Sequence, residues 1–83
     1  MPATATMTRP LFEIAQEIVR DWGIGKIYFG AEPYLRAMLA LNEVADQYGT
    51  ETGADIERRF LINAHSWRGE TAQRVKAELK AML

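Results

Sequence analysis

The sequence predicts an all-α protein, a compact four-helix domain with short connections. Apolar residues recur at three- and four-residue steps along four separate stretches, and residue types that end helices lie between them. Only one short segment, residues 24–29, is rich in the β-branched and aromatic types that favour strands. We therefore expect helices at about 10–22, 33–48, 53–64 and 67–82, with an extended apolar connector at 23–31.

The first helix follows a short stretch of small, Thr-rich residues. Residues 1–8 show no periodicity, and we interpret them as a flexible N-terminal tail, which leaves 9–83 as a single helical domain. Pro10 suits the first turn of a helix, where its missing N–H is not needed. The apolar stripe then runs to Trp22, and Gly23 is expected to end the helix.

The connector is the segment that most resembles a strand. Residues 24–29 read "IGKIYF", but the only weak pairing candidate within the chain is 3–8, and two strands alone are marginal in water. We therefore interpret 23–31 as an apolar connector held against a helical core. Pairing of this edge with another chain is the alternative.

Local signals also place the other three helices. Pro33 suits the start of the second helix, whose wide apolar arc extends to Tyr48 and predicts a central position, with Gly49 as its end. Thr52 opens the capping-box pattern "TGAD", which predicts the start of the third helix. Ser66 is the expected N-cap of the fourth helix.

Composition limits the classes of function. The 83 residues include no cysteine, which excludes a disulfide framework, a thiolate nucleophile and Cys-based metal sites. His65 is the only histidine, and no carboxylate lies three or four residues from it. We therefore expect no enzyme activity, no catalytic residue, no metal and no cofactor. The start lacks a signal-peptide pattern, and no stretch approaches the ~20 apolar residues of a membrane span, which indicates a cytoplasmic protein.

Charge is unevenly distributed along the chain. Residues 1–56 carry four basic and eight acidic side chains, whereas residues 57–83 carry six basic and three acidic ones. The third helix, a turn and the basic fourth helix could form a nucleic-acid-binding unit, with these candidate residues: Arg68, Arg74, Lys76 and Lys80. Complementary charges within the molecule, or between two copies of it, are the competing explanation. The net charge of −1 is lower than nucleic-acid-binding domains usually carry.

Large rings gather around the corner between the connector and the second helix. Exposed Tyr, Trp and Arg side chains are typical of the residues that dominate protein interfaces, while packing in the core is the alternative for each ring. The candidate protein-binding residues are Tyr28, Phe29, Tyr34, Trp67 and Arg68.

Two stretches resemble a known family. The patterns "YFGA-PYL-AM" (Tyr28–Met38) and "WRGE-A---KAELKAML" (Trp67–Leu83) are similar to short uncharacterised helical proteins of tailed bacteriophages and of prophages of Gram-positive bacteria. The resemblance runs from about Leu11 to Leu83, and "GIGK" at 23–26 departs from it. It implies a phage origin and a bacterial cytoplasm, and it transfers no catalytic residue.

These observations lead to two hypotheses about function. The first is a small non-enzymatic phage-type protein that acts by binding a host or phage protein, with a homodimer as one option. The alternative is a nucleic-acid-binding module that uses the basic C-terminal helix.

Overall fold

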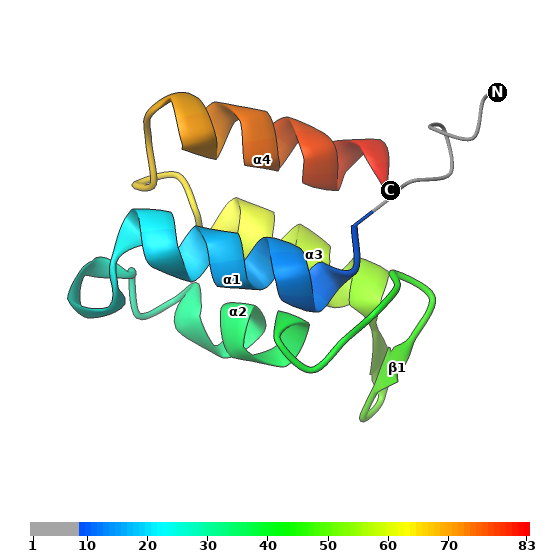
Figure 1. Cartoon of the computed structure of the whole chain (residues 1–83). Coiled ribbons are helices and arrows are strands. Elements are labelled where there is room, and N and C mark those ends of the chain that lie inside the picture. The colour runs from blue at the N-terminus through cyan, green and yellow to red at the C-terminus, as the bar shows by residue number, and fades with distance from the viewer. Residues whose placement is uncertain (1–8) are drawn as a thin grey trace, which may run out of the picture.

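The computed structural model describes residues 9–83, with the backbone alone for Ile24, so the expected tail at 1–8 lies outside the described residues. The elements are α1 (Leu11–Trp22), a 3₁₀ turn η2 (Ile24–Lys26), α2 (Glu32–Met38), β1 (Gln47–Tyr48), β2 (Glu51–Thr52), α3 (Gly53–Ile62) and α4 (Glu70–Ala81). Helix α1 contacts both α2 and α4, while α2 packs most extensively on α3 (Figure 1). The described part of the chain is thus mainly helical, as predicted, with one small antiparallel hairpin that was not predicted.

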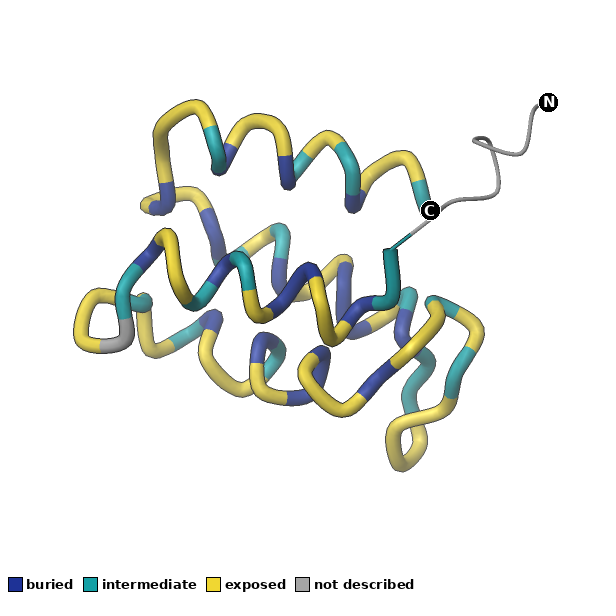
Figure 2. The backbone as a smooth tube through the Cα atoms, in the orientation of Figure 1, coloured by how far each residue is buried: buried dark blue, intermediate teal, exposed yellow. Residues whose placement is uncertain are grey.

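The hydrophobic core lies where the four helices meet. Each helix turns a stripe of buried residues inward, and exposed residues cover the outer faces and loops (Figure 2). The stripe of α1 has the expected spacing, since Leu11, Ile14 and Ile18 are each completely buried. Burial of one such side chain stabilises the fold by about 1.5–3 kcal/mol.

Helix α1 is capped by a distant loop. It begins after Pro10 and has no side-chain cap, but the N–H of Leu11 donates to the carbonyl of Asn42 and that of Phe12 to the carbonyl of Leu41, both at 2.9 Å. Those two amides have no partner within the helix, so the loop satisfies them. Gly23 ends the helix with φ 96°, as predicted for this glycine.

The second helix is much shorter than expected, and the prediction of a helix over 33–48 is wrong beyond Met38. The carbonyls of Leu41 and Asn42, which a longer helix would have used internally, bond instead to the start of α1. The carboxylate of Asp46 accepts hydrogen bonds from the N–H of Asn42 and of the residue after it, at 3.1 and 2.9 Å. These bonds stabilise a turn in place of a helix.

A hairpin replaces the end of the expected helix. Gly49, expected to end that helix, lies in the hairpin turn with φ 66°, and Tyr48 is exposed on β1 instead of lying in an apolar arc. The N–H of Asp55 donates to the Thr52 hydroxyl oxygen at 3.2 Å, which confirms the predicted cap of α3. The Asp55 carboxylate accepts from Arg58 at 3.3 Å and does not complete the capping box.

The fourth helix begins later than the expected 67–82. Gly69 has φ 113°, a backbone conformation that side chains other than glycine rarely adopt, so α4 starts only after it. Ser66 is therefore not the N-cap of this helix. Trp67 and Arg68 lie in the loop between α3 and α4 and not on a helix.

Candidate functional site

Two loops meet at one end of the molecule, away from the C-terminus (Figure 1). One is the connector at 23–31, and the other is the loop at 63–69 between α3 and α4. The connector forms no strand with any residue in 9–83. It is held to the core, as predicted, because Ala31 is completely buried and Ile27 packs against the buried cluster. The prediction that it is extended is wrong, since it contains the 3₁₀ turn η2 and ends in turns that lead into α2.

Three rings form a cluster at this end, which we call the aromatic corner: Tyr28, Phe29 and His65. The ring centroids of Tyr28 and Phe29 lie 4.9 Å apart, and those of Tyr28 and His65 lie 6.1 Å apart. Phe29 is 80% exposed and Tyr28 is 38% exposed, so Phe29 is not a core residue. The structure thus brings together two of the predicted protein-binding residues and adds His65, which was not among them.

The position of the Tyr28 ring depends on a glycine and on the end of α3. A Cβ atom at Gly30 would lie 2.5 Å from Cε2 of Tyr28 and 3.0 Å from Oδ1 of Asn63, so only glycine leaves room for this arrangement. The Asn63 amide in turn donates to the carbonyl of Arg59 at 2.8 Å. Ile62, in the last turn of α3, is 74% exposed and adds apolar surface at this end of the helix.

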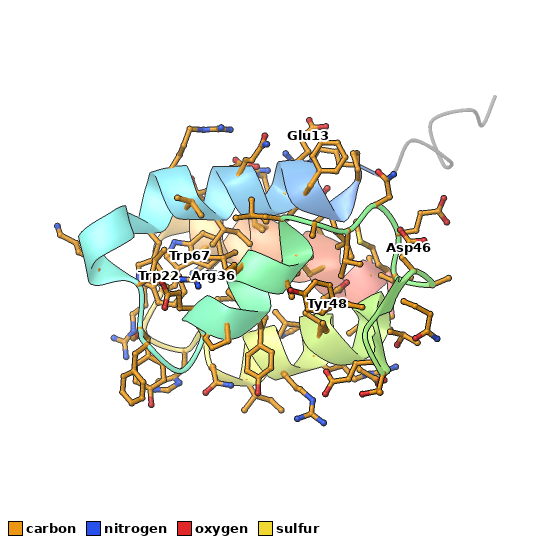
Figure 3. The ribbon with its side chains drawn as sticks, turned by 90° about the horizontal axis from the view of Figure 1, so that it is seen from below. Glu13, Trp22, Arg36, Asp46, Tyr48 and Trp67 are labelled. Carbon is orange, nitrogen blue, oxygen red and sulfur yellow. The ribbon has the colours of Figure 1, made fainter. Side chains whose placement is uncertain are left out.

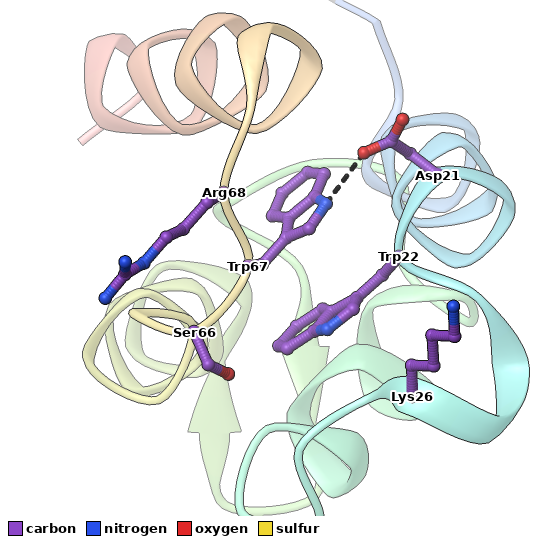
Figure 4. A pocket seen from close by; sticks show the side chains of 6 residues that line it. All are labelled: Asp21, Trp22, Lys26, Ser66, Trp67 and Arg68. Atoms are coloured by element: carbon purple, nitrogen blue, oxygen red, sulfur yellow. Dashed lines mark hydrogen bonds between the residues drawn. The ribbon is translucent and has the colours of Figure 1, made fainter.

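Next to the aromatic corner lies an open pocket of about 390 Å³, which we call the indole pocket (Figure 4). Its lining residues are Asp21, Trp22, Lys26, Ser66, Trp67 and Arg68. The rings of Trp22 and Trp67 are stacked, with centroids 5.7 Å apart and planes 12° apart. Viewed from below, both tryptophans lie toward one end of the molecule, far from Asp46 (Figure 3).

The indole pair is part of the core and forms the wall of the pocket. Trp67 is only 2% exposed, and its indole N–H donates to Oδ2 of Asp21 at 2.8 Å. Trp22 meets Phe60 edge to face, with centroids 6.4 Å apart. Trp67, predicted as a contact residue, is therefore placed to support the surface and offers very little of its own area to a partner.

Lys76 holds this loop against α4. Its ammonium donates to the carbonyl oxygen of Trp67 at 2.6 Å and lies 5.8 Å from the centroid of the indole. Burial lowers the pKa of Lys76, and the charges of Lys80 and Arg68 lower it further. One of the four candidate nucleic-acid-binding side chains is therefore committed to contacts within the molecule.

A second of these candidates is committed to α1. Arg74 donates to Glu17, and this hydrogen bond, together with the contact from Arg9, lowers the pKa of the Glu17 carboxyl. This pair joins an acidic residue of the first half of the chain to a basic residue of the last part. Such pairing is what the explanation by complementary charges within the molecule predicts. Only Arg68 and Lys80 among the four have neither an ion pair nor a side-chain hydrogen bond within residues 9–83.

Tyr34 is separated from the other predicted residues. It is half-buried on α2, and its hydroxyl, followed by the Glu51 carboxylate, raises the pKa of Arg59 on α3 above its usual value. Among the described residues no ring contact joins Tyr34 to the aromatic corner. The five predicted protein-binding residues therefore divide between the aromatic corner, the indole pocket and the face between α2 and α3.

Glu57 is a buried acid that sequence reasoning missed. It is completely buried, and neither carboxylate oxygen has a hydrogen-bond partner within residues 9–83. Burial raises the pKa of Glu57 to about 7, and the charge of Arg58 opposes this effect. Its position in the sequence could have indicated this burial, since Glu57 lies one turn before Phe60 on the inward side of α3.

Comparisons with known proteins add no assignment. No family model, no curated protein and no solved structure matches the chain. Within residues 9–83 no group of three or more His, Asp or Glu side chains is arranged to hold a metal ion. No helix in this range has the length and apolar character needed to cross a membrane.

Proposed function

We propose that the protein is a non-enzymatic binding protein whose partner is another protein. The contact surface is the aromatic corner together with Arg68 at the mouth of the indole pocket. The observation that carries this proposal is the exposure of Phe29, which is 80% exposed although the connector that bears it is firmly anchored to the core. Aromatic rings and arginine are the side chains that most often dominate the energy of protein interfaces.

The energetics of an exposed ring support this function. A phenylalanine that is 80% exposed gains little free energy from folding of its own chain, whereas its burial under a partner would contribute about 1.5–3 kcal/mol. The resemblance to short phage proteins suggests a host or phage protein as the partner and the bacterial cytoplasm as the location. A second copy of the chain would offer the same contact chemistry.

Catalysis is less well supported. Burial raises the pKa of Glu57 to about 7, but this acid is completely buried, so a substrate could not reach it. His65 contacts Tyr28. Within the described range no carboxylate accepts a hydrogen bond from its ring or forms an ion pair with it.

Nucleic-acid binding by the basic C-terminal helix is also less well supported. Arg74 and Lys76 already have partners within the molecule, which leaves Arg68 and Lys80 of the four candidates. Two free cations would give only a weak, salt-dependent attraction to phosphates.

The test is substitution of Phe29 by alanine. Because the ring is exposed, the free energy of unfolding of the Phe29→Ala variant should lie within about 0.5 kcal/mol of that of the parent chain. Capture of the partner should fall about tenfold or more, since an interface hot spot contributes 2 kcal/mol or more. The measurement is affinity capture from nuclease-treated bacterial cells with quantitative mass spectrometry, alongside thermal melting.

Leu39→Ala is the matched control. Leu39 is 41% exposed just beyond the C-terminal end of α2, away from the connector, so its truncation removes exposed apolar area outside the proposed surface. It should leave capture unchanged. If Phe29→Ala retains the captured protein, or if it unfolds the chain, the aromatic corner is not the contact surface.

A further inference from the structure

The indole pocket is lined by two cations and one carboxylate, and neither cation forms an ion pair within the described residues. Lys26 and Arg68 are exposed, and the side chain of neither makes an ion pair or hydrogen bond within residues 9–83. They lie on opposite sides of the stacked indoles (Figure 4). The one carboxylate that lines the pocket is Asp21, whose Oδ2 already accepts the hydrogen bond from Trp67 at 2.8 Å.

The surroundings of the pocket add to this positive potential. Lys76 lies behind Trp67 on the α4 side, where burial lowers its pKa and the charges of Lys80 and Arg68 add to this effect. An anionic group at the pocket would be attracted by Lys26 and Arg68 and would reduce the repulsion among the cations behind them. Ser66 supplies a hydroxyl that can donate a further hydrogen bond to such a group.

The pocket and the aromatic corner form one continuous surface. Tyr28 contacts His65, and Ser66 and Trp67 follow His65 directly in the chain. On the other side, Lys26 of the pocket and Tyr28 of the aromatic corner are separated by a single residue of the connector. A single extended segment of a partner can therefore reach both sites.

We propose, on the basis of the proposed function, that the partner presents an acidic peptide segment. Acidic side chains of this segment pair with Lys26 and with Arg68 on the two sides of the indole pocket, and a neighbouring apolar side chain packs on Phe29. The charge-assisted hydrogen bonds set the register, and the apolar contact supplies most of the affinity. A peptide fits better than a nucleic acid because the two cations of the pocket can neutralise only a few phosphates.

The first experiment is selection from a random peptide library displayed on yeast. The full chain serves as bait, and the double variant Lys26→Ala/Arg68→Ala is used in parallel. We expect the parent chain to enrich peptides with an excess of Asp and Glu beside an aromatic residue or leucine, and the double variant to lose them. Both positions are exposed, so the variant should fold, and a thermal melt of each bait checks this.

The second experiment measures the strongest selected peptide that lacks tryptophan. The double variant should bind it roughly tenfold more weakly, and affinity should fall as salt is added, because exposed ion pairs are modest and screened. Arg58→Ala, which removes an exposed cation of α3 that does not line the pocket, is the matched control and should change nothing. Since both tryptophans of the chain line the pocket, binding should also change their fluorescence.

The outcomes separate this inference from the proposed function. Enriched peptides that are neutral or basic but still need Phe29 would keep the proposed function and overturn the acidic partner. No enriched peptide at all would overturn both. If the parent chain binds a fluorescent poly-dT oligonucleotide and the double variant does not, the two cations bind nucleic acid and the acidic peptide is overturned. If the parent chain dimerises and the double variant does not, the two cations contact a second copy of the chain instead. Unchanged tryptophan fluorescence on binding would show that the acidic side chains of the peptide do not lie at the indole pocket.

Discussion

At the scale of single residues, Glu57 shows how burial alone sets the chemistry of a side chain. Its carboxylate has no hydrogen bond within the described residues, and the charge of Arg58 offsets only part of the loss of solvation. Burial raises its pKa from 4.5 to about 7, so between these pH values the folded chain holds a proton that the unfolded chain releases. The contribution of Glu57 to stability therefore falls as pH rises from about 4.5 to about 7.

The Glu57→Gln variant tests this effect. It keeps the shape of the side chain and removes the ionisation, so at pH 5 its free energy of unfolding should be close to that of the parent chain. At pH 8 it should be more stable by up to roughly 3 kcal/mol, which is the size of the pKa shift expressed as free energy. Urea unfolding at several pH values measures this. Glu43→Gln, an exposed control, should keep the parent pH dependence, and a Glu57→Gln variant that also keeps it would contradict the assignment.

At the scale of elements, the loop between α2 and the hairpin docks on the start of α3. A Cβ at Gly53 would lie 2.7 Å from the carbonyl oxygen of Glu43 and 3.0 Å from Cα of Val44, so two backbones touch here without a side chain between them. The N–H of Gly53 donates to the carbonyl of Asp46 at 2.8 Å, and the following N–H donates to Val44 at 2.9 Å. The loop, the hairpin and α3 thus form one packed unit.

The Gly53→Ala substitution should break this contact. The added methyl group would collide with backbone atoms, which cannot rotate away as a flexible side chain can, so we expect a loss of about 1–3 kcal/mol in the free energy of unfolding. Thermal or urea unfolding measures the loss. Thr50→Ala, in the exposed hairpin turn, should stay within about 0.5 kcal/mol of the parent chain. Equal stability of the two variants would show that the approach of the backbones is looser than described.

At the scale of the whole molecule, a group of ion pairs ties the start of the described chain and α1 to α4. Arg9 donates through Nε and Nη2 to the two carboxylate oxygens of Glu78 at 3.0 and 2.7 Å. Its Nη2 also lies 2.9 Å from Oε1 of Glu17, an ion pair without a hydrogen bond at that oxygen. Oε2 of Glu17 accepts a hydrogen bond from Arg74. This group joins segments that are far apart in sequence.

The Arg9→Ala variant should lower stability at neutral pH by about 1–2 kcal/mol, since these partly buried pairs are bidentate and form a network. Arg9→Lys should recover only part of this, because an ammonium group cannot bond both oxygens in one plane. The pKa of Glu17 is lowered, so its share of the stability is present above its usual pKa and is lost as pH falls through the folded value. Urea unfolding at pH 7 and pH 3 should therefore show a smaller effect of Arg9→Ala at pH 3. Arg36→Ala, which breaks an exposed helical pair with Glu32, should cost less than 0.5 kcal/mol at both pH values.

Sequence reasoning succeeded where the signal is local. Gly23 and Thr52 mark real helix ends, because the capping groups lie within a few residues of the helices they end or begin. It failed for 33–48, because the partners of the 41–42 carbonyls are amides of α1, far away in sequence. It also placed the start of α4 too early, because nothing in the local pattern indicated that Gly69 adopts a positive φ.

The candidate surface could be predicted only in part for the same reason. Tyr28 and Phe29 are exposed at the connector, and their neighbourhood in the sequence already suggested a shared surface. Trp67 is buried because it stacks on Trp22, a contact that exists only once α1 and the loop before α4 come together. The role of His65 as a neighbour of Tyr28 depends on the same tertiary arrangement.

The carbonyls that cap α1 have a consequence for the order in which the chain can fold. Amides in the first turn of a helix usually exchange hydrogen with water quickly, but those of Leu11 and Phe12 should be protected, and their exchange should report the opening of the loop at 41–42. During synthesis residue 11 leaves the ribosome before residue 42, so the first two amides of α1 cannot receive these hydrogen bonds until Asn42 has emerged. Helix α1 is therefore capped only once the middle of the chain has been made.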